Sequence, residues 1–177
     1  TKVTDVSSLS QCPSLTTVRL TNTKVVDLGP LARGCGAALE VLDVRNTCVA
    51  DTSPLRACVG LRSVDFQGSE VGDVSPLSQC LNIEDLNLRN TRVINISPLG
   101  SLKKLKKLHL GRALIANLKA LSTCVSLQEI SLERTWVVNL EPLSYLPLES
   151  IDIRNTAVAK LDPLRTITTL KNLYASN

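Results

Sequence analysis

The feature that most constrains this chain is a repeat of about 22 residues that runs through nearly all of its length. Three segments are almost interchangeable: LEVLDVRNT from Leu39, IEDLNLRNT from Ile83 and LESIDIRNT from Leu148. Successive units are 24, 22, 22, 22, 22, 21 and 22 residues apart, and no linker interrupts them. A period of this length is typical of stacked repeats, so the sequence predicts a solenoid. The units begin at Leu15, Leu39, Leu61, Ile83, Leu105, Leu127, Leu148 and Leu170.

Each unit opens with the pattern L-x-x-L-x-L, which alternates at its centre as a short strand with one buried face should. The fourth position is apolar throughout: Val18, Leu42, Val64, Leu86, Leu108, Ile130, Ile151 and Leu173. The sixth position is also apolar: Leu20, Val44, Phe66, Leu88, Leu110, Leu132, Ile153 and Ala175. Stacking these columns predicts an α/β solenoid, a right-handed superhelix with a concave parallel sheet of about eight short strands.

The second half of each unit must turn back toward the next strand. Ser53-Pro54-Leu55 recurs at residues 75–77 and 97–99, and Asp162-Pro163 follows the same pattern. We expect the Ser or Asp side chain to cap a single helical or 3₁₀ turn that begins at the proline, on the convex side. Just before these turns lies a column of Asp and Asn residues. Each is alone in its unit, so we interpret them as turn residues that bond the local backbone rather than as calcium ligands. They are Asp27, Asp51, Asp73, Asn95, Asn117 and Asn139.

This pattern resembles the 22-residue subclass of leucine-rich repeats, as found in regulatory subunits of type-1 protein phosphatase and in bacterial internalins. The DVSPLSQC segment from Asp73 to Cys80 is similar to repeat proteins of kinetoplastid parasites. Thr or Ser stands where the family often has an Asn ladder, and Ala113 interrupts even that column. The resemblance implies protein recognition by the concave sheet. We expect residues 1–177 to form one leucine-rich-repeat domain, with seven full repeats and a partial repeat at each end, from a longer protein.

The six cysteines indicate buried thiols rather than a disulfide framework. Five of them share a column in which other units carry Leu102, Leu146 and Ile167, as expected of a small buried hydrophobic residue. These are Cys12, Cys35, Cys58, Cys80 and Cys124, whereas Cys48 lies outside the column on the rim. Such thiols fit a reducing compartment, which favours an intracellular location in cytoplasm or nucleus, with the cell surface as the alternative.

The sequence offers little for catalysis or metal binding. His109 is the single histidine and is expected to point outward from its strand. No matching nucleophile is evident in the sequence, and there is no close-set cysteine pair for zinc. We therefore predict a protein that is not an enzyme and that has no cofactor and no metal.

The candidate binding surface is the set of outward-facing positions on the sheet and its rim. Arg is enriched at binding hot spots, and three arginines share one outward column. An alternative is that Asp43 with Arg45, and Asp152 with Arg154, merely neutralise each other on a solvated sheet. The predicted partner-binding residues are Arg45, Asp65, Asn87, Arg89, His109, Arg112, Arg134, Trp136, Asp152 and Arg154.

Trp136 is the sharpest of these residues. It lies on the rim beside Leu114, bordered by Arg112 and Arg134, which predicts an amphipathic contact site. The alternative is that Trp136 packs locally across two neighbouring loops.

Two other functions stay open. The repeats could be a structural spacer without a ligand. The cluster Lys103, Lys104, Lys106 and Lys107 could contact an acidic protein, nucleic acid or lipid. Nucleic acid is not the expected partner, because aromatic residues for base stacking are not interleaved with the lysines. No apolar run approaches the roughly 20 residues that span a bilayer.

Overall fold

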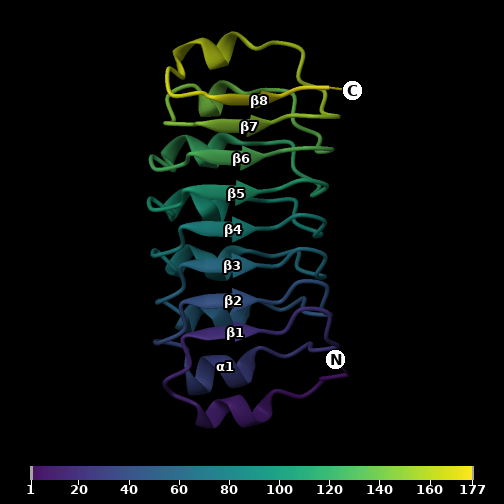
Figure 1. Ribbon diagram of the computed structural model, residues 1–177, viewed down its shortest axis with the longest axis vertical. Coiled ribbons are helices and arrows are strands. Elements are labelled where there is room, and N and C mark those ends of the chain that lie inside the picture. Colours follow the sequence, from purple (N-terminus) through teal and green to yellow (C-terminus); the bar gives the residue numbers. More distant parts are fainter. Residues whose placement is uncertain (1, 177) are drawn as a thin grey trace.

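The computed structural model describes residues 2–176 and shows a stack of similar units, each with one short strand and one helical turn (Figure 1). Over this range eight strands pair in parallel and in chain order, which confirms the predicted α/β solenoid. The strands are β1 (Thr17–Arg19), β2 (Val41–Asp43), β3 (Ser63–Asp65), β4 (Asp85–Asn87), β5 (Lys107–His109), β6 (Glu129–Ser131), β7 (Ser150–Asp152) and β8 (Asn172–Tyr174).

Short helices lie behind the sheet, on the convex side (Figure 1). All are 3₁₀ helices except α1 (Gly29–Gly34), an α-helix. The 3₁₀ helices are η1 (Ser7–Gln11), η2 (Ser53–Ala57), η3 (Ser75–Gln79), η4 (Ser97–Ser101), η5 (Lys119–Thr123), η6 (Glu141–Leu143) and η7 (Asp162–Thr166).

The strand register is the same from unit to unit, so each sequence column becomes a physical column. Leu86 in β4 aligns with Val64 in β3 and with Leu108 in β5. Units of other lengths keep this register because the difference is taken up on the convex side. The 24-residue unit contains α1, and the 21-residue unit contains η6, which has only 3 residues.

The core is the stack of apolar columns. From Leu39 to Leu148 the first position of every unit is fully buried, and the fourth position is buried from Val18 to Ile151. Each buried Leu or Ile stabilises the fold by about 1.5–3 kcal/mol relative to an exposed one. Leu173 in β8 is 40% exposed, because among the described residues β8 has a neighbouring strand on one side only.

The predicted burial of the cysteine column is confirmed for Cys35, Cys58, Cys80 and Cys124, whereas Cys12 is partly exposed. All six cysteines are free thiols. Burial raises the pKa of Cys58 to about 12 and that of Cys80 and Cys124 to about 11. The thiol of Cys80 donates to the carbonyl oxygen of Leu55 in the preceding unit, 3.3 Å away.

The Asp and Asn column before each helical turn has the predicted turn role. Oδ1 of Asp51 accepts the backbone N–H of Ser53 at 2.8 Å, and the equivalent bond recurs at Asp27, Asp73, Asn95, Asn117 and Asn139. The predicted capping by Ser or Asp is wrong: Ser53 and Asp162 are themselves the first residues of η2 and η7, and the side chain just before each helix makes no capping bond. The Asp or Asn two residues earlier, such as Asp51 before Ser53, satisfies the first free N–H of the helical turn instead.

The turn after each strand depends on two further columns. In the Thr column, the hydroxyl of Thr47 donates to the carbonyl oxygen of Val44 at 2.7 Å, and Thr23, Thr91, Thr135 and Thr156 repeat this bond. The residue before each of these has a left-handed backbone, with φ between 52° and 57° at Asn22, Asn46, Asn90, Arg134 and Asn155. Asn and Gly tolerate this conformation best. The repeat spacing also places Thr1 in the Thr column and Asn177 in the column before it, and both residues lie outside the described range.

Two carboxylates of the turn column, Asp51 and Asp73, make the fold sensitive to acid. The hydrogen bond from the backbone N–H of Ser53, followed in size by the one from its hydroxyl, holds the pKa of Asp51 below its usual value. Ser75 lowers the pKa of Asp73 in the same way. These carboxylates therefore stabilise the fold above their unfolded pKa of about 3.9, and the contribution is lost as pH falls through the lower folded pKa. Asp51→Asn with Asp73→Asn should flatten the loss of unfolding free energy between about pH 5 and pH 2, measured by urea denaturation. Asn95→Asp should steepen it, and identical profiles for all three chains would contradict this role.

Candidate functional site

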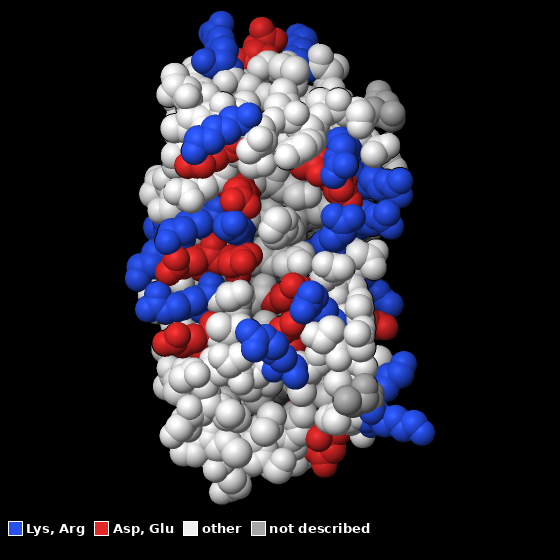
Figure 2. Space-filling model, in the orientation of Figure 1, with Lys and Arg blue, Asp and Glu red and all other residues white. Residues whose placement is uncertain are grey.

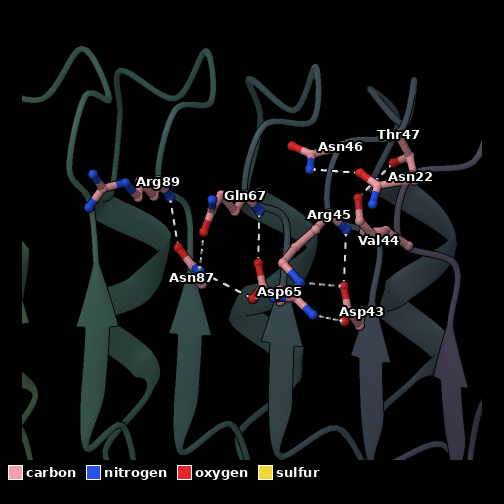
Figure 3. Close-up of polar contacts among 10 residues, drawn as sticks. All are labelled: Asn22, Asp43, Val44, Arg45, Asn46, Thr47, Asp65, Gln67, Asn87 and Arg89. Carbon is pink, nitrogen blue, oxygen red and sulfur yellow. Dashed lines mark hydrogen bonds and ion pairs between the residues drawn. The ribbon is translucent and has the colours of Figure 1, made fainter.

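A chain of polar side chains crosses the first half of the concave sheet (Figure 3). Arg45 forms two bonds with the carboxylate of Asp43, at 3.0 and 2.6 Å, and its Nε lies 3.5 Å from Asp65. Asn87 on β4 donates to Asp65 at 3.2 Å and to Gln67 at 3.3 Å. Charges that could face a partner are therefore largely used within the chain, and Asp43 and Arg45 form the ion pair that the alternative interpretation expected.

The two aspartates of this chain differ in electrostatic balance. Burial alone would raise the pKa of Asp43, but the bonds from the Arg45 side chain and backbone outweigh it, so its pKa lies below the usual value. For Asp65, burial dominates, and the bonds from Gln67 and Asn87 do not offset it, so its pKa is raised. The negative charge of Asp65 is thus the less well compensated of the two.

A hollow of about 300 Å³ opens on the second half of the sheet, over β5, β6 and β7. It lies on the face shown in Figure 2, where cationic and anionic side chains interleave in two bands along the sheet. Its walls hold Arg154, which pairs with Asp152 at 2.7 Å and lies 5.8 Å from the ring centre of Tyr174. Its lining comprises Arg89, His109, Glu129, Ile130, Ser131, Glu133, Ser150, Asp152, Arg154 and Tyr174.

Glu133 connects the two sides of this hollow. Its carboxylate pairs with Arg154 at 3.1 Å and with Arg89, two strands away on the other side. The reach is possible because Gly111 stands between them: a Cβ at that position would lie 2.8 Å from Cγ of Glu133. The glycine leaves a groove across the β5 unit, and the glutamate lies in it, only 8% exposed.

The floor of the hollow has polar groups that the fold does not use. At the ends of β2, β3, β4 and β7, the Asp or Asn of the outward column accepts the backbone N–H two residues later, as Asn87 does from Arg89 at 3.0 Å. His109 and Ser131 replace it in the β5 and β6 units. Among the described residues, neither side chain makes a hydrogen bond, although both are only partly exposed. They are therefore free to bond a ligand.

The pairing of strands places Ser131 directly beside His109, as their shared position in the repeat predicts. The two do not form a nucleophile–base pair, because no hydrogen bond joins them. The nearest carboxylate along this column, Asp152, is engaged with Arg154 and lies beyond the serine rather than behind the imidazole. The arrangement lacks the orienting contact that such catalysis requires.

The three predicted rim residues do not belong to the hollow. Arg112, Arg134 and Trp136 lie after the strands, where the chain leaves the sheet, and all three are exposed. Trp136 is 70% exposed, which excludes the alternative of local packing.

The lysine cluster is engaged with the fold. Lys106 pairs with Glu84 at 2.6 Å and Lys107 with Glu129 at 2.9 Å. Lys103 donates to the carbonyl oxygens of Gly100 and Thr123, and Lys104 donates to Asn82. These contacts favour a role in stacking the units over attraction of an acidic ligand. Between residues 2 and 176 no group of His, Cys, Asp and Glu has the arrangement of a metal site.

The ten predicted residues thus fall into three groups. Arg45, Asp65 and Asn87 share the polar chain, Arg89, His109, Asp152 and Arg154 surround the hollow, and the rest lie on the rim. Sequence reasoning left Glu133, Ser131, Tyr174 and Gly111 out of the predicted site. Glu133 could have been found in the sequence, because it is the one acid in the outward column that holds the three arginines, and it directly follows Gly111 in that column.

No protein-family model matches the sequence, and no curated protein does. Solved structures match it closely in fold. An internalin (inlF) of Listeria monocytogenes superposes with a TM-score of 0.92 at 24% identity, over 97% of this chain. An internalin C2 of the same organism gives 0.91 at 21% identity, over 99% of this chain and 77% of its own.

The fold is that of a leucine-rich-repeat protein. A Leptospira interrogans leucine-rich-repeat protein also matches, with a TM-score of 0.90 at 21% identity over 97% of this chain and 45% of its own. A plant peptide hormone receptor, RGFR1, solved in complex with RGF2, gives 0.78 at 14% identity, over 96% of this chain and 31% of its own. The chain spans 51% of the first internalin. Among the residues described, no helix is long and apolar enough to cross a membrane.

The contrast between the two aspartates of the polar chain can be tested by amide substitution. Asp43→Asn removes a carboxylate that Arg45 stabilises and should lower the unfolding free energy by about 1 kcal/mol. Asp65→Asn removes a carboxylate whose raised pKa means that its ionised form opposes folding at neutral pH, so stability should stay equal or rise. Urea unfolding at pH 7 measures both. Equal destabilisation by the two substitutions would contradict the assignment.

Because Glu133 reaches Arg89 through the groove at Gly111, we expect the two side chains to be energetically coupled and a methyl group at position 111 to abolish the coupling. In a double-mutant cycle, Arg89→Ala and Glu133→Gln should show a coupling of roughly 0.5–1 kcal/mol. Gly111→Ala should bring it near zero, because the new Cβ displaces Glu133. Gly72→Ala is the control, since a Cβ there has no neighbour closer than 3.7 Å. A coupling that survives Gly111→Ala would show that Glu133 does not depend on the groove.

Proposed function

We propose that this leucine-rich-repeat chain is a non-enzymatic protein-binding module that holds a segment of a partner protein on its concave face. The observation that carries the proposal is the hollow over β5, β6 and β7, whose floor presents His109 and Ser131 without internal hydrogen bonds. Polar groups left free in a concavity are available to bond a ligand.

The walls of the hollow suit a peptide. Arg154 and Tyr174 form an exposed edge with a guanidinium–aromatic contact, and both residue types are enriched at binding hot spots. Glu133 pairs with Arg89 and Arg154, and Asp152 pairs with Arg154, so the hollow is preorganised and has little ordering entropy to lose on binding. The plant receptor of similar fold, solved with RGF2, supports a role in binding.

The alternatives carry less support. A spacer without a ligand would have no use for the unbonded His109 and Ser131. The lysine cluster is engaged in ion pairs and hydrogen bonds within the chain. The 22-residue subclass and the kinetoplastid resemblance rest on the sequence and stay predictions. The same holds for the intracellular location and for a single domain within a longer protein.

Filling the hollow should weaken peptide binding to the concave face without unfolding the chain. A random 12-residue display library selected on the immobilised chain should yield a class of peptides that bind Ser131→Arg at least about tenfold more weakly, a loss of about 1.4 kcal/mol. Ser122→Arg, on the convex side, is the control and should bind as wild type, and both variants should melt at the wild-type temperature. A peptide pool insensitive to Ser131→Arg would place binding elsewhere.

A further inference from the structure

A second exposed surface follows the strands, on the flank where the chain turns toward the convex side. Side chains there alternate inward and outward, and three consecutive units, those of β4 to β6, present apolar residues outward. Ile94 is 67% exposed, Leu114 49%, Trp136 70% and Val138 59%. Arg112 and Arg134 precede Leu114 and Trp136 by two residues and share their outward side. These six residues are called the flank patch below.

The repeat itself does not require an apolar flank patch. At the position of Leu114 and Trp136, the earlier units carry Lys24, Cys48, Glu70 and Arg92. Two large apolar side chains exposed side by side in water are unfavourable unless something covers them, so their presence marks an interaction surface.

The two arginines are costly where they stand. Arg112 and Arg134 have φ of 62° and 55°, in a column where the other described units have Asn or Gly. A long side chain in the left-handed region is strained, and such strain persists where function holds it. Neither guanidinium is in an ion pair or a side-chain hydrogen bond with any residue from 2 to 176, unlike Arg45, Arg89, Arg92 and Arg154.

The turn column of Asp and Asn residues, which borders the flank patch toward the convex side, carries no carboxylate beside the patch. In the β1 to β3 units the turn column holds Asp27, Asp51 and Asp73, whereas in the β4 to β6 units it holds Asn95, Asn117 and Asn139. The amides keep the turn bond and remove the carboxylate. The patch therefore combines an apolar surface with two uncompensated positive charges.

We propose that the flank patch binds an acidic segment of a partner protein, whose apolar side chains cover Leu114 and Trp136 while its carboxylates pair with Arg112 and Arg134. This rests on the proposed binding function and adds a second contact surface and the chemistry of its ligand. Arg–carboxylate pairs next to an apolar anchor that excludes water are the arrangement that makes such contacts strong.

The test uses the same 12-residue display library on the 177-residue chain. The selection is then repeated with an excess of soluble Ser131→Arg variant, which competes for every peptide that binds outside the hollow. The peptides lost in this second selection are called the flank peptides. They should be enriched in Asp and Glu together with Leu, Phe or Trp. Their affinity should fall at least about tenfold with Trp136→Ala, a loss of about 1.4 kcal/mol, and fall as NaCl is raised from about 0.05 to 0.5 M.

Arg112→Asn with Arg134→Asn is the decisive variant. It restores the residue of the other units, so its melting temperature should equal or exceed that of wild type, while flank-peptide affinity falls at least about tenfold and loses its salt dependence. Tyr145→Ala, an aromatic residue 91% exposed after η6, and Lys24→Ala are the matched controls and should leave binding unchanged.

Four outcomes would overturn the inference. Flank peptides could be basic or insensitive to both arginines. All selected peptides could require the hollow, which would leave the concave-face function standing and remove only the flank patch. Sedimentation could show a dimer that Trp136→Ala dissociates, which would assign the patch to a second copy of this chain. If the library yields no binders at all, the concave-face function and the flank patch both fail.

Discussion

Every part of this structure depends on the parallel register between neighbouring strands. A single unit has one buried face and cannot cover it alone, so its apolar columns are shielded only when Leu86 meets Val64 on one side and Leu108 on the other. That requirement fixes the strand and the buried turn positions but leaves the outward positions free. It also explains why the 24-residue and 21-residue units differ behind the sheet rather than within it.

Properties that repeat in every unit could be predicted from the sequence. The burial of Leu86, the buried thiol of Cys80 and the turn bond of Asp51 follow from a column, because a column reports the same local environment eight times. Contacts that skip a unit could not be predicted. Glu133 reaches Arg89 only because Gly111 leaves room, and the raised pKa of Asp65 depends on burial that no spacing reveals. The capping by Ser was mispredicted because the motif looks the same whether the cap is the Ser or the residue two before it.

The departures from the repeat concentrate in the β5 and β6 units. There the sheet column changes from Asp and Asn to His109 and Ser131, and the left-handed column changes to Arg112 and Arg134. The first change frees polar groups on the concave face, and the second places unpaired charge on the flank. Both lie outside the buried columns, so the stack is preserved. A solenoid can specialise in this way, since the buried columns that hold neighbouring units together do not depend on the outward positions.

The reactivity of the buried thiols reports where neighbouring units of the stack separate. Cys58, Cys80 and Cys124 are spaced along the stack, and each is fully buried with a pKa near 11 or 12. A thiol of that kind reacts with an alkylating reagent only after its own unit has separated from the next. The order in which the three are modified therefore reads out the direction in which the stack unzips, from either end or from the middle, without any added label.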